Sequence, residues 1–208
     1  MDSAVSLVQT YLRVNGYFTV TEFPVVEAVR GSGLKTATDL DVLACRFPAA
    51  KRVVIERNRA HGHGRTGVPD PELGVEAGVV DMIVGEVKES AAEFNPAGLR
   101  RSVFAAALAR FGCCADEAHA DGVAETLLRD GWAEAHPGHV VRLMAFGTRT
   151  GRSGPYRQIG IDHVHRFLDA YVRDNWGTLR HTESKDPALA FVMLREKARR
   201  AHRAGRNS

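Results

Sequence analysis

The chain has 208 residues, of which 44% are hydrophobic and 25% are charged, and its formal net charge is +3. This length leaves little room for two complete domains, and the composition is ordinary for a soluble globular protein. No apolar run approaches the roughly 18 residues of a membrane span and no signal-peptide pattern opens the chain, so we expect a cytoplasmic protein with no membrane partner.

The first two predicted elements are a helix over residues 4–14 and a strand over residues 17–29. The strand is rich in aromatic and β-branched residues, and Pro24 within it indicates an edge position or a bulge. Regular pairing would put Glu22 and Glu27 on opposite faces, so at most one of them can approach a site on the sheet. We take Glu27 as a candidate for the surroundings of such a site.

A glycine-rich turn leads into a second predicted strand, residues 38–47. Lys35 lies in the turn and is a candidate contact for a phosphate, the alternative being a solvated lysine. Asp39 and Asp41 project from one face of the strand, because successive side chains alternate. The strand is otherwise largely apolar, and a carboxylate inside a sheet is costly unless it is paired or binds a metal.

The stretch from residue 46 to residue 80 contains several arginines and two histidines, separated by glycines and prolines. A loop of this length in a compact domain is usually functional or disordered. A zinc site at His61 and His63 would need further ligands, and even with the distant cysteines no known ligand spacing is matched. A basic flap over nucleic acid is a better interpretation than a zinc site, and a plain solvated loop is better still.

A third predicted strand, residues 81–90, carries Glu86 and Lys88 on one face and Asp81 on the other. If this strand neighbours the strand of Asp41, two carboxylates and one amine converge. Carboxylate oxygens are hard ligands that select Mg²⁺ or Mn²⁺ rather than zinc. We therefore predict a cation between Asp41 and Glu86, with Lys88 placed to orient or deprotonate an attacking water.

The segment Asp39-Leu40-Asp41-Val-Leu-Ala44, read with Glu86-Val87-Lys88, resembles the motif of the PD-(D/E)XK superfamily of restriction-endonuclease-like nucleases. The resemblance covers roughly the first two thirds of the chain. It departs from the family pattern at Leu40, which stands in place of proline, and in the long separation between the two halves of the motif. The resemblance implies that Asp41 and Glu86 bind the metal, with the Val87 carbonyl completing its shell, and that Lys88 is the catalytic lysine; we add Asp39 and Glu27 as residues close to the ligands.

The resemblance also implies an α-β-β-β-α-β core. We therefore predict an α/β fold with a central mixed β-sheet flanked by helices. This restriction-endonuclease-like core is placed at residues 1–150, and a C-terminal helical extension is placed at residues 156–208.

Downstream of the motif, Asn95-Pro96 introduces a helix, a second helix covers residues 121–129, and a strand covers residues 139–146. This order also fits a winged helix that reads DNA, but the strand is apolar enough to be buried, so we prefer a role in completing the sheet. The three cysteines are odd in number and two are adjacent, so no disulfide framework is expected and none is marked as a nucleophile: Cys45, Cys113 and Cys114.

Two further helices, opened by Asp162 and by Asp186-Pro187, form the C-terminal extension, which either packs on the core or supplies a homodimer face. His163 and His165 could be ligands, but exposed helix histidines are the more common case and are expected here. Residues 195–208 hold six basic residues against one acidic residue. This tail is either a phosphate-attracting arm or a solvated helix end, and its candidate nucleic-acid contacts are Arg199, Arg200 and Arg203.

The sequence thus favours a nuclease that uses Mg²⁺, with Mn²⁺ as a substitute, to hydrolyse phosphodiester bonds in nucleic acid, with DNA as the expected partner. One alternative is a catalytically inactive nucleic-acid-binding or interaction protein of the same fold. The other is a winged-helix regulator, which would leave the charged strand residues unexplained.

Overall fold

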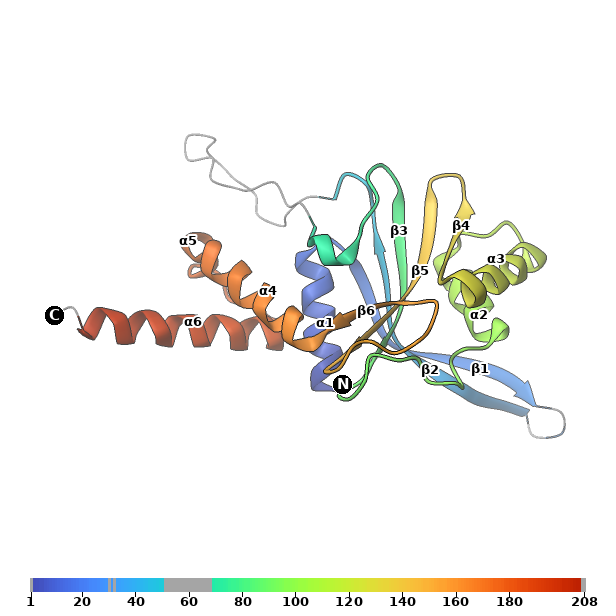
Figure 1. Cartoon of the computed structure of the whole chain (residues 1–208), viewed down its shortest axis with the longest axis horizontal. Coiled ribbons are helices and arrows are strands. Elements are labelled where there is room, and N and C mark those ends of the chain that lie inside the picture. Colours follow the sequence, from blue (N-terminus) through green and yellow to red (C-terminus); the bar gives the residue numbers. More distant parts are fainter. Residues whose placement is uncertain (1, 30, 32, 51–68, 207–208) are drawn as a thin grey trace.

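The computed structural model describes residues 2–29, 31, 33–50 and 69–206 and has an α/β fold, in which helices cover both faces of a mixed sheet (Figure 1). The helices are α1 (Ser3–Val14), α2 (Arg101–Phe111), α3 (Glu117–Asp130), α4 (Ile161–Asp174), α5 (Trp176–Leu179) and α6 (Pro187–Arg206). The strands are β1 (Phe18–Val29), β2 (Gly33–Arg46), β3 (Val80–Val87), β4 (Trp132–His136), β5 (His139–Gly147) and β6 (Arg157–Gly160), and a 3₁₀ turn, η2 (Pro71–Leu73), precedes β3.

The sheet has the strand order β1-β2-β3-β5-β4, and β6 also pairs with β5. The first three strands form an antiparallel meander. The chain then crosses over through α2 and α3, forms β4, and turns back as β5, which is parallel to β3. β4 pairs antiparallel with the first part of β5, and β6 pairs parallel with its last part. The carboxyl ends of β3 and β5 therefore meet at one edge of the sheet.

Alternate residues of β3 join two separate hydrophobic cores, as a strand buried on both faces requires. Met82 and Val84 pack in the core with α2 and α3, whereas Ile83 packs in the core with α1 and α4. Asp81 and Glu86 are the charged residues of this strand, and their exposed fractions are only 1% and 3%. Both carboxylates therefore need compensation inside the protein.

The helix predicted at residues 4–14 is confirmed as α1, and the strands predicted at residues 38–47, 81–90 and 139–146 are confirmed as β2, β3 and β5. β2 begins earlier than predicted, at Gly33, because it keeps pairing with β1 up to the hairpin turn. β5 lies between β3 and β4 and so completes the sheet, as preferred over a wing.

The first strand has both features that its proline indicated. β1 is the outer strand of the sheet, and its pairing with β2 shifts register between Val25 and Val26, next to Pro24. Glu22 has a φ of 53°, which is uncommon for a residue other than glycine and marks a local kink.

Several details of the fold differ from the sequence prediction. The helix predicted to follow Asn95-Pro96 begins only at Arg101, because residues 96–98 form a turn. β4 and β6 were not expected as strands, and both are short. The prediction that Asp162 caps a helix is wrong, because α4 begins at Ile161 and Gly160 is the residue before its first turn. Asp162 lies inside that turn, where its carboxylate pairs with Arg166.

The prediction that His163 is exposed is also wrong. Its Nε2 lies 2.6 Å from Oδ2 of Asp70, and the Tyr11 hydroxyl donates to the same oxygen at 2.8 Å. Asp70 also receives an N–H from Glu72 at 3.0 Å and donates its own N–H to the Asn15 side chain at 2.8 Å. This buried cluster ties α1, η2 and α4 together. The zinc and flap interpretations of His61 and His63 fall outside the described residues.

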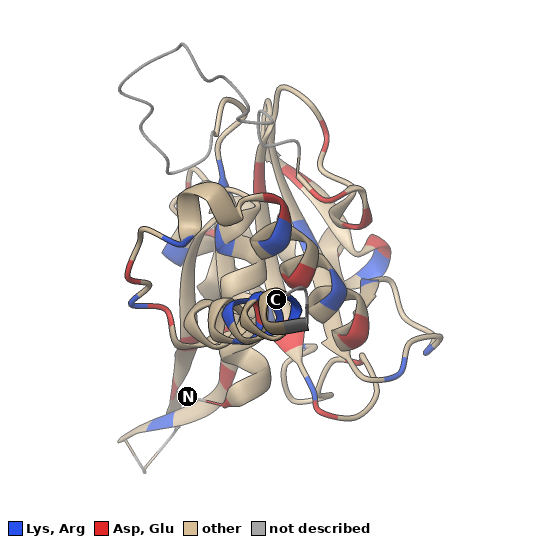
Figure 2. Ribbon diagram, turned by 90° about the vertical axis from the view of Figure 1, so that its left-hand side faces the viewer, with Lys and Arg blue, Asp and Glu red and all other residues tan. Residues whose placement is uncertain are grey.

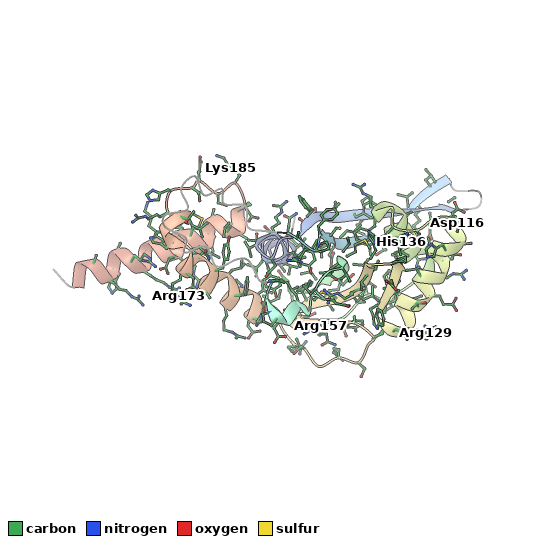
Figure 3. The ribbon with its side chains drawn as sticks, turned by 90° about the horizontal axis from the view of Figure 1, so that it is seen from above. Asp116, Arg129, His136, Arg157, Arg173 and Lys185 are labelled. Atoms are coloured by element: carbon green, nitrogen blue, oxygen red, sulfur yellow. The ribbon has the colours of Figure 1, made fainter. Side chains whose placement is uncertain are left out.

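The C-terminal helices pack on α1, because Leu168 and Val192 are buried in the same core as Val8. α6 then runs away from the sheet, so that its C-terminal half stands clear of the body (Figure 1), and Figure 2 looks at this helix end-on, with Lys and Arg in blue around its C-terminal end. Seen from above, Arg173 and Lys185 mark this helical end and Arg129 marks the opposite end (Figure 3). Among the described residues, no helix is long and apolar enough to cross a membrane.

Candidate active site

Asp41 and Glu86 stand across from each other where β2 and β3 separate. The last pair between the two strands is Val42 opposite Gly85, and the same register continued by one step opposes Asp41 and Glu86. A Cβ at Gly85 would lie 2.5 Å from Cγ1 of Val42, so residue 85 must be glycine for the strands to approach this closely. The backbone therefore brings the two predicted ligands to one end of neighbouring strands.

Asp41 holds the end of β3 through its side chain. Its Oδ2 accepts the N–H of Val87 at 2.7 Å, at the position where pairing between the two backbones has stopped. β2 also departs from strict alternation here, since Leu40 and Leu43 belong to the core with α2 and α3 whereas Val42 belongs to the other core. The irregular backbone leaves the Asp41 carboxylate half-buried beside β3.

Glu86 is buried and makes an ion pair through its Oε1 with Lys88, the first residue after the end of β3. The backbone amide of Asn95 lies near this carboxylate and acts to lower its pKa. A Cβ on Gly98 would lie 3.9 Å from Oε2, so the turn before α2 covers this carboxylate closely. The Lys88 side chain is 34% exposed, so its amine reaches solvent while Glu86 does not.

The two carboxylates outnumber the one lysine. Burial raises the pKa of Glu86, and the negative charge of Asp41 raises it further, against the opposing effect of the hydrogen bond from Lys88. Burial likewise raises the pKa of Asp41, with the N–H of Val87 and the charge of Lys88 acting in the opposite direction. Burial is the main cause of both shifts, and the mutual repulsion of the acids adds to it at Glu86; a bound cation would oppose both effects.

The donor atoms of the pair fit a hard divalent cation. Carboxylate oxygens from two neighbouring strands match Mg²⁺, which proteins often bind through one or two carboxylates while it keeps several waters. Within the described ranges, no three His, Cys, Asp or Glu side chains form a ready group for a metal, so a zinc-like closed site is not present there. Asp41 and Glu86 are the residues that could hold Mg²⁺ or Mn²⁺.

Of the other residues predicted near the ligands, Asp39 is close and Glu27 is not. The charge of Asp39 raises the pKa of Asp41, although Asp39 itself is exposed. Glu27 lies opposite Lys35 near the tip of the β1-β2 hairpin, and its carboxylate is 3.4 Å from Arg100. The structure therefore brings neither Glu27 nor Lys35 to the Asp41–Glu86 pair.

The arginines predicted to contact nucleic acid lie on α6, whose second half leads away from the site (Figure 1). Arg199 lies 3.6 Å from Asp169, and Arg200 lies 2.6 Å from Glu196 and 5.3 Å from the ring centre of Trp176. These contacts stabilise α6 against α4 and α5. Arg203 is exposed beyond them.

Asp2 is a further acidic residue near the site that the sequence did not reveal. Its side chain caps α1 by accepting the N–H of Ala4 at 2.8 Å, and its charge raises the pKa of Asp41. In Figure 1 the chain leaving β3 passes close to the N-terminus, which explains this coupling. The proximity of Asp2 to Asp41 depends on how α1 packs on the sheet.

Asp81, at the other end of β3, belongs to a separate cluster, as its position on the opposite face predicted. Arg142 on β5 donates two hydrogen bonds to its carboxylate, each 2.7 Å long, and the Tyr17 hydroxyl donates a third. Arg142 also donates to the carbonyl of Leu73 at 2.7 Å. The charge of Asp81 is thus balanced within the protein.

The structure therefore defines an α/β protein with a mixed sheet and, at the carboxyl end of β3, a site of one buried carboxylate, one half-buried carboxylate and one partly exposed lysine. Comparisons with protein-family models, curated proteins and solved structures give no significant match. Any inference about function therefore depends on the geometry of the Asp41, Glu86 and Lys88 side chains.

Proposed function

We infer that the chain is a metal-dependent nuclease that hydrolyses phosphodiester bonds in DNA. The observation that carries this proposal is the buried Glu86, which pairs with Lys88 just past the end of β3 and lies opposite Asp41 of β2, so that two carboxylates share one lysine. Perturbed carboxylates at the edge of a sheet are typical of sites that bind a cation or transfer protons.

The order of the elements supports the resemblance to PD-(D/E)XK nucleases. The resemblance implies an α-β-β-β-α-β order, and α1, β1, β2, β3, the helices α2 and α3, and β5 follow one another in this way, with β4 added before β5. Asp41 and Glu86 fall on the second and third strands of the meander. In such a nuclease, Asp41, Glu86 and the Val87 carbonyl would hold Mg²⁺ or Mn²⁺, which supplies a Lewis acid against the charge that develops on the phosphate.

The side chain of Lys88 has a separate role in this proposal. The ion pair with Glu86 holds the amine of Lys88 in place. Because the Lys88 side chain is partly exposed, the amine can still donate a hydrogen bond to a water and orient it toward a phosphate. Asp41 acts on the same place through the backbone, because its bond to Val87 holds the end of β3 that carries Lys88. The residues are thus positioned before any substrate arrives.

A binding protein of the same fold is the competing function. It would retain two destabilising carboxylates with no cation to compensate them, which lowers stability without any gain in function. The nuclease proposal gives both carboxylates a use.

The test is cleavage of supercoiled and linear DNA by the wild-type protein and by Lys88→Ala, in Mg²⁺, in Mn²⁺ and in EDTA. We expect cleavage only with metal, and a fall of roughly 10²- to 10⁴-fold in Lys88→Ala, the range that one positioned proton-transfer group contributes. Lys185→Ala is the matched control, because Lys185 is 83% exposed and pairs with an equally exposed acid. No cleavage by the wild type in either metal would leave the binding protein as the better function.

A further inference from the structure

Three helices begin around one pocket beside the candidate active site. The pocket has a volume of about 740 Å³, and Ser3, Ile161 and Pro187 from the first turns of α1, α4 and α6 line it. Figure 1 shows the starts of these helices close together, near the N-terminus. A volume of this size is in the range of pockets that hold small organic ligands.

Gln9 of α1 lines this pocket and is only 7% exposed. Among the residues that the structure describes, none forms a hydrogen bond with its side-chain amide. Among the described side chains, every nitrogen or oxygen atom that is completely inaccessible to solvent has a hydrogen-bond partner. The Gln9 amide has none, so it must retain some accessible surface, and it faces the pocket rather than the core. A buried amide with both a donor and an acceptor unused indicates a ligand with the complementary pair.

The charges around the pocket exclude a phosphate from its interior. Asp2 already caps α1, and Asp186 caps α6 by accepting the N–H of Leu189 at 3.1 Å. The positive ends of these two helices are therefore occupied by carboxylates. Glu89 adds another negative charge at the exposed side of the pocket. The ligand that fits is uncharged there and carries hydrogen-bond donors.

The remaining wall of the pocket is apolar. Leu7 and Val192 contribute aliphatic surface, and Phe191 adds an aromatic ring that is 61% exposed. An exposed phenylalanine is a surface on which a flat ring can stack. An amide edge together with an aromatic face is the combination that recognises a nucleobase outside a duplex.

The pocket and the candidate active site share two segments of chain. Ser3 follows Asp2, whose charge acts on Asp41, and Glu89 follows Lys88. The pocket wall is therefore one residue along the chain from Lys88 and one residue from Asp2, which is coupled to Asp41. We propose that the pocket receives an unstacked nucleobase of the substrate strand, whose edge pairs with Gln9 and whose face stacks on Phe191; this inference rests on the proposed function.

The experiment measures binding of single-stranded DNA in EDTA, where cleavage cannot occur. One probe is a fluorescent deoxyadenosine oligonucleotide, and the other has the same length and phosphates but is abasic at every position. We expect the wild type to bind the probe with bases more tightly, and Gln9→Leu to bind that probe roughly 5- to 150-fold more weakly, the range for a bidentate base contact. Gln9→Leu should bind the abasic probe as the wild type does.

Gln9→Leu is a suitable variant because leucine replaces an unpaired buried amide with an apolar group of similar size. Its melting temperature should equal or exceed that of the wild type, which separates a binding defect from a folding defect. Phe191→Ala, at an exposed position, should weaken binding of the probe with bases alone. Equal binding of both probes by the wild type, unchanged in Gln9→Leu, would mean that the pocket holds water and would overturn the inference.

The outcomes for the pocket and for the nuclease are separable. If the wild type cleaves DNA with metal but does not distinguish the two probes, the inference fails and the proposed function stands. If it distinguishes the probes through Gln9 but never cleaves, the nucleobase pocket stands and the nuclease proposal fails.

Discussion

β3 carries a buried carboxylate near each end, and the two ends treat it differently. Asp81 receives two hydrogen bonds from Arg142 and one from Tyr17, so one negative charge meets one positive charge and a hydroxyl. Glu86 receives one lysine, and a second carboxylate, Asp41, stands across from it.

The pKa shifts of the charged groups differ between the two ends of β3 in the same way. Burial tends to lower the pKa of Arg142, but its bonds to Asp81 and the charge of Asp81 outweigh this and raise it, so the ion pair resists neutralisation. At the other end, burial raises the pKa of both Asp41 and Glu86, so the ionised form of each carboxyl group is disfavoured there. One strand thus contains a completed structural ion pair and an incomplete acidic site, and incompleteness is what indicates function.

The largest expected effect comes from removing the acid at the incomplete end. Glu86→Ala should abolish metal-dependent cleavage and also abolish any rise of melting temperature on addition of Mg²⁺, since ligands stabilise only the state that binds them. Thermal unfolding with and without Mg²⁺ measures the second quantity without relying on activity. Glu183→Ala, at a residue that is 82% exposed, is the control and should keep both properties.

Removing the acid at the completed end should damage the fold instead. Asp81→Ala leaves Arg142 buried and unpaired, for which we expect a decrease of about 3–5 kcal/mol in the free energy of unfolding. Asp130→Ala is the matched control, because Arg129 donates to Asp130 with similar geometry at the surface. Denaturant titration of the two variants should show a large decrease for Asp81 and nearly none for Asp130. Equal decreases would remove the distinction between buried and exposed pairs.

The third effect is a dependence on pH in metal-free protein. Because the pKa of Glu86 is raised in the folded state, the folded protein binds more protons than the unfolded chain above about pH 4, the ordinary carboxyl range. The free energy of unfolding should therefore fall as the pH rises from there through the raised pKa. Glu86→Gln removes this contribution, so its stability relative to the wild type should increase across that window. A difference that stays constant with pH would contradict the raised pKa.

The smallest effect extends the comparison to α6. Replacing Arg199, Arg200 and Arg203 together by alanine should reduce the slope of log affinity for DNA against log salt, by up to about 0.9 for each phosphate that an arginine neutralises in the wild type. Arg129→Ala, at the opposite end of the molecule (Figure 3), is the control. An unchanged slope would place these arginines with Arg142, as residues that only hold the structure together.

Most strands of the sheet, and the separation of Asp81 from Glu86, could be predicted from local sequence patterns. Strands with β-branched residues and fixed alternation determine which residues face each core, so the placement of Asp81 away from Glu86 followed from parity. β4 and β6 were not predicted because they are only five and four residues long, and β4 has no β-branched residue. Elements this short form because the β5 edge is available to them, which no local pattern contains.

The parts of the site that were missed depend on contacts between distant segments. Gln9 looked like an ordinary polar residue of a helix, and its burial arises only when α4 and α6 pack on α1. The proximity of Asp2 to Asp41 and the contact of His163 with Asp70 have the same origin. Helical spacing shows which face of a helix is apolar, but it does not show what lies against it.

The kink in β1 has a consequence for how the chain behaves in concentrated solution. An outer strand of twelve residues offers its free backbone to any other strand, and such edges promote association between molecules. Pro24 has no N–H to donate, and Glu22 turns the backbone out of the extended conformation. A second chain can therefore pair with only short pieces of this edge, so the strand that borders the site is protected against uncontrolled polymerisation.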